Sequence, residues 1–206
     1  MKLITLTACG GAGKDSILNA LVRNHSELKT IVSYTSRPMR YGEQEGVEYY
    51  FKTYDEMNRL INNNGLLEHR IYTVRNGDIW IYGIPMDAID WFSNNIYIVI
   101  VDYDGLKQIR KVLKGKGMLN DLYSFYISVS DQTRFTRTFN RDNNKKMTDE
   151  EFNEFINEIN RRFEADTKEV LPAKYDKDII VVNNDDRPLI NTIKEIEERL
   201  KAWNLV

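Results

Sequence analysis

The chain has 206 residues, 42% of them hydrophobic and 11% aromatic, and its formal net charge is -2. This composition supports one domain with a buried core and argues against disorder. The small charge gives no general attraction to nucleic acid or to an anionic membrane. A single cysteine excludes an internal disulfide, and the chain has no apolar run long enough to cross a bilayer. We therefore expect a cytoplasmic protein, monomeric or homodimeric, that binds neither nucleic acid nor membrane.

The first predicted elements are a strand, a glycine-rich turn and a helix. Residues 2–7 are apolar enough for a short buried strand, and residues 15–23 place their apolar side chains on one helical face. The turn between them has the sequence Ala-Cys-Gly-Gly-Ala-Gly-Lys-Asp-Ser over residues 8–16. A strand, a glycine turn and a helix in this order are the context that a phosphate-binding loop requires.

The remaining predicted elements continue the alternation of strands and helices. Strands are expected over residues 28–33, 96–101, 122–129 and 179–182, and helices over residues 54–64, 131–140, 148–168 and 186–203. A polar hinge at residues 141–147 separates two of the helices. This alternation predicts an α/β fold in which helices cover both faces of a parallel sheet.

The glycine loop is a candidate phosphate site because its backbone amides can converge on one anion at the positive end of the following helix. The residues expected to contact ATP there are Gly10, Gly11, Ala12, Gly13, Lys14, Asp15 and Ser16. Lys14 would reach the outer phosphates as a point charge. The loop departs twice from the usual pattern G-x-x-x-x-G-K-[ST], with Ala8 at the first glycine and Asp15 at the final hydroxyl.

Asp15 occupies the position whose hydroxyl ordinarily ligates Mg²⁺. A carboxylate can also ligate this metal. At ~4 Å and an effective dielectric constant of ~20, however, its repulsion with a phosphate is about 4 kcal/mol before the metal and Lys14 offset it. Asp15 is therefore a metal ligand, a first-turn carboxylate turned away from the phosphates, or a sign of weakened ATP binding.

A second phosphate site is indicated by Arg37 and Arg40, which lie beside a cluster of hydroxyl residues and tyrosines in the segment from Ser33 to Phe51. The planar guanidinium group of arginine binds phosphate oxygens in pairs, and hydroxyl groups fill the remaining acceptor positions. Two phosphate sites close together in one chain suggest a reaction that moves phosphate from one nucleotide to another.

The same segment carries a resemblance to a known family. The pattern S-x-[ST]-R-P-x-R-x-G-E-x-x-G-x-x-Y-x-F of guanylate kinases is read here from Thr35 through Phe51, with Ser33 just upstream. The similarity continues in order through Gly65-Leu66-Leu67-Glu68, Tyr82-Gly83, the strand ending at Asp102, and Val181-Val182-Asn183. The chain thus resembles a P-loop nucleoside monophosphate kinase with a variant loop, built on a three-layer core with a parallel sheet.

The resemblance implies one domain over residues 1–206. Its core would comprise residues 1–32, 96–129 and 166–206, with an acceptor-binding subdomain at 33–95 and a helical lid at 130–165. It implies transfer of phosphate from ATP, with Mg²⁺, to GMP or dGMP. The residues that would then bind the acceptor phosphate are Arg37, Arg40, Tyr49 and Tyr82, and those that would read its base are Ser33, Glu68 and Asp102.

The resemblance also implies catalytic arginines and a contact to the base of ATP. With Lys14 and Arg37, the lid arginines would stabilise the moving phosphoryl group, and the candidates are Arg137, Arg141 and Arg162 or its neighbour Arg161. Asn183, after the last strand, would contact the adenine of ATP.

Two departures from the family keep alternatives open. Ile84 stands where a small hydroxyl residue is usual, and the segment 69–81 is longer than the family norm and carries Arg70, Arg75 and Trp80. The chain could therefore phosphorylate a different nucleoside or deoxynucleoside monophosphate. The loop departures at Ala8 and Asp15 leave open a catalytically weakened module that binds a phosphorylated or acidic peptide through Arg37 and Arg40.

Overall fold

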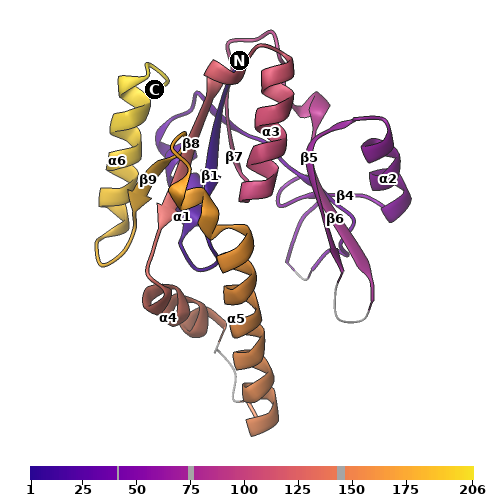
Figure 1. The fold of residues 1–206 in the computed structure, drawn as a ribbon, viewed down its shortest axis with the longest axis vertical. Helices are drawn as coiled ribbons and strands as arrows, with labels where there is room; N and C mark the ends of the chain where they lie inside the picture. Colours follow the sequence, from indigo (N-terminus) through magenta and orange to yellow (C-terminus); the bar gives the residue numbers. More distant parts are fainter. Residues whose placement is uncertain (41, 74–76, 143–146) are drawn as a thin grey trace.

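The computed structural model describes residues 1–40, 42–73, 77–142 and 147–206. Within these residues the core is a five-stranded sheet in the order β2-β7-β1-β8-β9, and every neighbouring pair is parallel. Its strands are β1 (Lys2–Thr7), β2 (Leu28–Thr30), β7 (Ile96–Ile100), β8 (Leu122–Ser128) and β9 (Ile180–Asn183). Figure 1 shows this sheet between helices, as the alternation of strands and helices predicted.

The two faces of the core sheet are covered by different helices. Along β1, Leu3 belongs to one buried cluster, whereas Ile4 and Leu6 belong to the other, because successive side chains of a strand point to opposite faces. Helices α1 (Lys14–Asn24) and α6 (Leu189–Ala202) pack on the Ile4 face, and α3 (Tyr103–Gly115) packs on the Leu3 face.

A second, smaller sheet lies beside α3 (Figure 1). Its strands follow the order β4-β3-β6-β5, and they are β3 (Tyr34–Thr35), β4 (Tyr50–Phe51), β5 (Leu66–Thr73) and β6 (Ile79–Pro85). Helix α2 (Tyr54–Asn62) packs on this sheet through Met57. A capping box starts the helix, with Thr53 accepting a hydrogen bond from the amide of Glu56 at 3.2 Å.

Two further helices, α4 (Asp131–Asp142) and α5 (Asp149–Glu169), extend below the core sheet in Figure 1. They are joined by packed aromatic rings, namely Phe135, Phe139, Phe152, Phe155 and Phe163. Short 3₁₀ helices lie at Met86–Ala88, Leu119–Asp121 and Leu171–Tyr175. No helix in the described ranges has both the length and the apolar character needed to span a bilayer.

The predicted α/β fold is confirmed, and many of the predicted bounds differ from the structure, three of them in ways that bear on the site. The strand predicted over residues 28–33 is wrong beyond Thr30, because the chain leaves the core sheet there and residues 34–35 pair with β6 instead. The last helix begins at Leu189 rather than at residue 186, after Pro188. Helix α4 continues to Asp142, so the hinge predicted at 141–147 does not begin at 141, and residues 143–146 lie outside the described part.

The sequence analysis missed helix α3 and the four strands of the second sheet. Helix α3 has buried residues at helical spacing, namely Leu106, Ile109 and Leu113, so a signal for it was present. The long hairpin of β5 and β6 accounts for part of the 69–81 segment, and Arg75 of that segment lies outside the described residues. In β5 the run Glu68-His69-Arg70 weakens the strand signal, whereas the β-branched and aromatic residues of β6 did provide one.

Candidate active site

The glycine loop connects β1 to α1 and requires glycine at two positions. Gly11 and Gly13 have φ angles of 76° and 86°, a left-handed conformation that residues with a Cβ rarely adopt. A Cβ atom on Gly11 would also lie 2.8 Å from the carbonyl oxygen of Arg134. Gly13 caps α1, so the loop meets the positive end of an 11-residue helix, an arrangement suited to anions.

Side chains from three other elements hold the loop in place. The Nδ2 group of buried Asn184 donates a hydrogen bond to the carbonyl of Ala12 at 2.9 Å, and Nε of Arg134 donates to the carbonyl of Gly10 at 2.9 Å. The amide of Gly10 donates to Oδ2 of Asp166 at 2.8 Å, and this carboxylate also pairs with Arg134. The sequence analysis assigned none of these three side chains to the site, because their contacts span more than a hundred residues.

Lys14 and Asp15 begin α1 at the open side of the loop. Nζ of Lys14 lies 3.2 Å from Oδ2 of Asp15, and the two side chains are 29% and 75% exposed. Asp15 therefore carries its carboxylate into solvent at the first turn of the helix, where negative charge is favourable. Ser16 is exposed as well.

Arg137 lies next to this loop. Its Nη2 group donates to the carbonyl of Asn184 at 3.0 Å, and Asn184 in turn holds Ala12. Asn183 is exposed, and its Oδ1 accepts the amide of Asp185 at 3.1 Å. Of the two asparagines it is thus Asn184 that contacts the loop, and an adenine contact of Asn183 stays a prediction.

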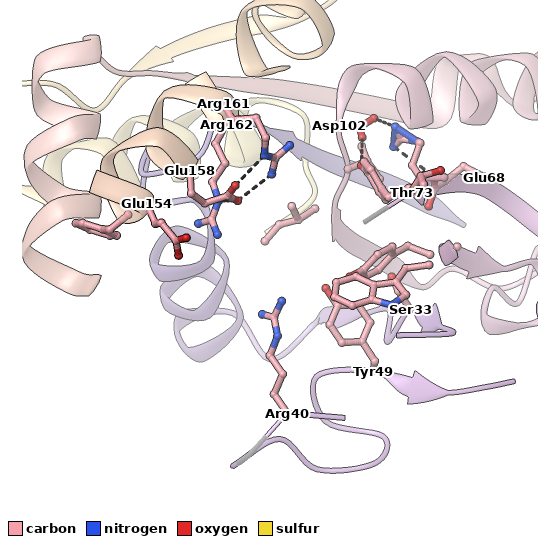
Figure 2. Close-up of a pocket in the computed structure, with 18 of the residues that line it drawn as sticks. Ser33, Arg40, Tyr49, Glu68, Thr73, Asp102, Glu154, Glu158, Arg161 and Arg162 are labelled. Atoms are coloured by element: carbon pink, nitrogen blue, oxygen red, sulfur yellow. Dashed lines mark hydrogen bonds and ion pairs between the residues drawn. The ribbon is translucent and has the colours of Figure 1, made fainter. Parts of the chain in front are cut away.

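A cavity of about 1230 Å³ opens between the second sheet and α5. The predicted acceptor residues that line it are Ser33, Arg40, Tyr49, Glu68, Tyr82 and Asp102. Figure 2 shows Glu68 and Asp102 on one side of this cavity and Arg161 and Arg162 of α5 on the other. The structure thus brings together residues that are up to 129 positions apart, from Ser33 to Arg162.

Arg37 is placed differently from the other predicted acceptor residues. It is only 3% exposed, and its Nη1 and Nη2 groups donate to the two carboxylate oxygens of Glu43 at 3.0 and 2.7 Å. These hydrogen bonds hold the pKa of Glu43 at about 2. The guanidinium group also lies 5.5 Å from the ring centre of Tyr49, so Arg37 supports a wall residue of the cavity. Its direct role in catalysis stays a prediction.

Glu68 is a buried acid in the cavity wall. It lies within β5, where it is 6% exposed, and burial raises its pKa to about 7. The nearby carboxylate of Asp102 raises this pKa further, whereas the positive charge of Arg70 opposes the shift. Asp102 caps α3 by accepting the amide of Gly105 at 3.1 Å and forms an ion pair with Arg70.

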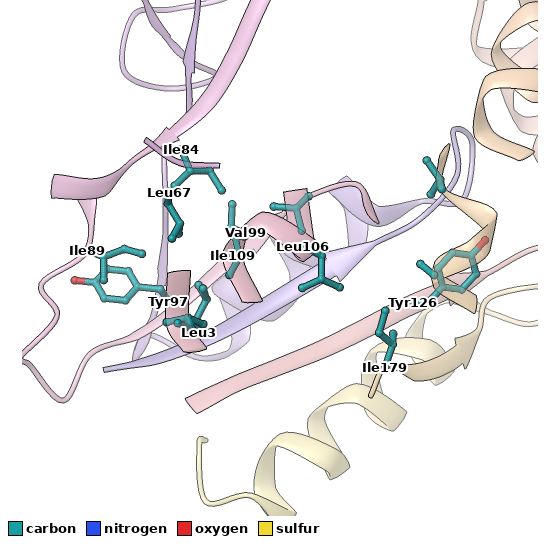
Figure 3. Close-up of a cluster of buried hydrophobic side chains, with 14 of the residues drawn as sticks. Leu3, Leu67, Ile84, Ile89, Tyr97, Val99, Leu106, Ile109, Tyr126 and Ile179 are labelled. Carbon is teal, nitrogen blue, oxygen red and sulfur yellow. The ribbon is translucent and has the colours of Figure 1, made fainter. Parts of the chain in front are cut away.

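Ile84 has a packing role where the family usually has a hydroxyl. It is fully buried beside Leu67 in the cluster that joins the second sheet to α3 and the core sheet (Figure 3). The position therefore stabilises the contact between the two sheets and offers no side-chain hydrogen bond to a ligand.

The arginines that the sequence analysis predicts for a lid lie in different places. Arg161 and Arg162 line the cavity and share Glu158, with nitrogen–oxygen distances of 2.8 and 2.9 Å. These bonds hold the pKa of Glu158 at about 2. Arg141 is exposed in the last turn of α4, whereas Arg137 lies against the loop.

These features define a class of protein before any comparison with relatives. A parallel α/β core, a glycine loop followed by lysine at the start of α1, and an adjoining cavity lined by arginines are the parts of a P-loop nucleotide phosphotransferase. A model of the guanylate kinase family matches residues 1–202. The chain belongs to the guanylate kinase family.

Individual relatives agree with this membership. The guanylate kinase of Rickettsia felis is 30% identical over 98% of this chain and 96% of its own length, and that of Synechococcus sp. is 30% identical over 97% and 82%. The guanylate kinase of Saccharophagus degradans is 35% identical, but that match spans only about half of each protein, 54% of this chain and 53% of the relative.

A solved structure shares the fold. The crystal structure of guanylate kinase from Anaplasma phagocytophilum aligns with a TM-score of 0.65, covering 100% of this chain and 87% of that chain at 19% identity. The likeness shows that the two chains share an α/β fold with a mostly parallel central sheet.

Proposed function

We propose that this chain transfers the terminal phosphoryl group of ATP to GMP or dGMP, giving ADP and the nucleoside diphosphate. The observation that carries the proposal is the pairing of two sites in one molecule, namely a glycine loop with Lys14 and a cavity that presents Arg40 and Glu68. Membership of the guanylate kinase family supports both the reaction and the acceptor.

In this proposal the donor side stabilises the phosphate charge of ATP. The loop amides and Lys14 bind the phosphates, and Arg137 lies close enough to the loop to contribute a second positive charge. Arg141 and Arg162 act from the lid. The acceptor phosphate is largely ionised at neutral pH, so the attack on ATP needs no general base.

On the acceptor side, Arg40, Tyr49 and Tyr82 align the attacking phosphate, and Glu68 reads the base. A buried carboxylate can accept the N1 and N2 hydrogens of guanine, whereas adenine lacks this donor pair and would leave Glu68 unpaired. Closure of the second sheet and the lid over both nucleotides would exclude water and suppress hydrolysis of ATP.

Mg²⁺ is the proposed metal of the reaction. The described residues contain no cluster of three or more acidic, histidine or cysteine side chains that could hold a metal alone. This fits Mg²⁺, which usually takes one or two carboxylates together with substrate phosphates. Asp15, exposed at the start of α1, is the residue that would hold it. When bound, the metal neutralises charge on the phosphates.

The two alternatives have less support. A peptide-binding module has no use for Lys14 or for the loop glycines that the structure holds in place with Asn184 and Arg134. A kinase for another base would not require a buried carboxylate in the cavity wall. Guanine is therefore the preferred base.

A nucleotide panel tests the proposal. Purified protein is incubated with Mg·ATP and GMP, dGMP, AMP, CMP, UMP or dTMP, and ADP formation is measured. We expect turnover with GMP or dGMP at least a hundredfold above the others, as a site built around specific hydrogen bonds predicts. Preferred turnover of another acceptor would refute guanine recognition, and no turnover with any nucleotide at high enzyme concentration would refute the kinase assignment.

A further inference from the structure

Arg70 lies between two of the carboxylates that line the cavity, those of Glu68 and Asp102. Its Nη1 group forms an ion pair with Asp102, and its Nη2 group lies 3.5 Å from Oε2 of Glu68. The side chain is 16% exposed and lines the cavity together with both acids. The guanidinium group of Arg70 therefore lies in the cavity wall, between the two acids that are predicted to read the base.

The local sequence leaves room for this arrangement. Gly105 is buried in the first turn of α3, and a Cβ atom there would lie 2.8 Å from Nη2 of Arg70 and 2.8 Å from Oε2 of Glu68. Any larger residue would displace one of the two groups. The close approach of Arg70 and Glu68 to α3 therefore depends on glycine at this position.

Arg70 also has hydrogen-bonding capacity beyond its two carboxylates. An arginine carries five N–H donors, two on each Nη atom and one on Nε. Each Nη atom contacts one carboxylate, which occupies one of its two N–H groups. The second N–H group of each Nη atom can donate to a further acceptor. The Nε atom is buried without a hydrogen-bond partner, so the guanidinium group is fixed by its two carboxylates and not by the surrounding backbone.

Other side-chain donors near the second sheet in this cavity, namely Ser33, Thr73, Trp80 and Tyr82, are neutral. Glu68 itself offers only acceptors when it is ionised. Tyr72 directs its hydroxyl to Asp102 at 3.4 Å. Arg70 is a charged donor adjacent to Glu68, and this pair presents a donor next to an acceptor.

We propose that Arg70 is a base-specificity residue that donates a hydrogen bond to the 6-oxo group of the acceptor purine, beside the contact of Glu68 with the N1 hydrogen. This inference rests on the proposed function and assigns the recognition of one further atom of the base. An adenine base would place its 6-amino donor against the guanidinium donor, which is repulsive. Arg70 thereby selects 6-oxopurines, and Glu68 distinguishes guanine from hypoxanthine through the 2-amino group.

The test separates recognition of the 6-oxo group from support of Glu68. The acceptors are GMP, IMP (which has the 6-oxo but not the 2-amino group) and 6-thioguanosine monophosphate (which keeps the N1 hydrogen and the 2-amino group but carries sulfur, a weak acceptor, in place of the 6-oxo oxygen). For each we compare kcat/KM and, without ATP, the dissociation constant of the wild-type protein and Arg70→Met. The matched control is Arg59→Met, which removes an exposed arginine of α2 in the same subdomain.

For Arg70→Met we expect kcat/KM with GMP and IMP to fall by the same factor, roughly 10- to 150-fold, the range for one hydrogen bond from a charged donor. The 6-thio nucleotide should change by less than about threefold, since its sulfur accepts only a weak hydrogen bond while its N1 hydrogen still reports on Glu68. Equal losses for all three nucleotides would mean that Arg70 only positions Glu68 and Asp102, and would overturn the proposal. An unchanged value for GMP would overturn it as well.

A second variant covers the case in which Arg70→Met fails to fold because Glu68 and Asp102 lose their cation. Arg70→Lys keeps the charge and lacks the forked donor, so we expect the same selective loss, at least severalfold, for GMP and IMP. Equal behaviour of the three nucleotides in this variant would again refute the role. Wild-type protein that binds GMP but transfers no phosphoryl group would refute the proposed activity, and the ratios of dissociation constants would still decide the role of Arg70.

Discussion

The glycine loop uses backbone groups that neighbouring side chains hold in place, whereas the acceptor cavity presents its side chains directly to the space where a ligand fits. At the loop, the side chains of Asn184 and Arg134 each donate a hydrogen bond to a backbone carbonyl group. In the cavity, Glu68 and Arg40 are themselves part of the lining. A single change in the cavity wall is therefore expected to alter specificity directly, whereas a change behind the loop acts only through the position of its backbone.

Removing Lys14 should give the largest effect, because it deletes the one loop side chain assigned directly to phosphate. We expect Lys14→Ala to lower kcat about 10³-fold, the upper range for removing one preorganised charge-stabilising group. The KM for GMP should change little. Steady-state ADP formation measures both, and Lys194→Ala, an exposed lysine of α6, is the matched control. A loss below tenfold would mean that phosphate binding depends on other groups.

Changing Glu68 to glutamine tests the acceptor side with the same assay. The amide cannot accept two hydrogen bonds from guanine and places a donor against one of them. We expect kcat/KM for GMP to fall about 10²-fold or more, with the KM for ATP unchanged. An unchanged kcat/KM for GMP would mean that Glu68 does not read the base. The proposed difference between a cavity that acts through its side chains and a loop that acts through its backbone would then be wrong.

The pH dependence should come from the acceptor side. Burial raises the pKa of Glu68 from its ordinary value to about 7, so the carboxyl group is neutral below this pH and gains its acceptor form as pH rises. We expect kcat/KM for GMP to rise about tenfold from pH 6 to pH 8, beyond the change caused by ionisation of GMP itself. The pH profile of Glu68→Gln measures the change that is due to GMP alone. An equal rise of kcat/KM in this variant would mean that Glu68 is not the group that titrates.

The same pKa shift makes a prediction for stability. The unfolded chain releases the Glu68 proton near pH 4.5 and the folded chain near pH 7, so the folded state holds more protons between these values. Stability should therefore fall as pH rises through this window, and the fall should be smaller in Glu68→Gln. Chemical denaturation at pH 5 and pH 8 measures this difference. An identical pH dependence in both proteins would mean that Glu68 ionises normally.

The smallest effect on kinetics is expected for a residue that holds the glycine loop in place without contacting ATP itself. Asn184→Ala removes the hydrogen bond to Ala12, and we expect the KM for ATP to rise about fivefold, corresponding to roughly 1 kcal/mol for one hydrogen bond. The KM for GMP should stay the same. A larger effect on GMP than on ATP would show that the two sites are not supported separately.

The sequence predicted the parts of the molecule that depend on local pattern. The strand, glycine turn and helix at residues 2–24 follow from apolar spacing and from two glycines with left-handed backbone. The resemblance placed residues such as Ser33 and Asp102 at one site, and the structure brings them to one cavity.

The parts that could not be predicted depend on long-range partners. Nothing near Arg37 indicates that it is buried against Glu43, because the loop between them sets that distance. The contacts of Asn184 and Asp166 with the loop depend on the order of strands in the core sheet and on where α5 lies against it. Arg70 reaches Asp102 only because the hairpin of β5 and β6 packs against α3.

The most direct measurement of the central claim follows the terminal phosphate of ATP. Protein is mixed with ATP labelled at the γ-phosphate, Mg²⁺ and unlabelled GMP, and the products are separated. The account predicts that the label appears in GDP, with little released as inorganic phosphate, and that Lys14→Ala abolishes the transfer. Label that stays in ATP while GMP is bound, or that appears only as inorganic phosphate, would contradict it.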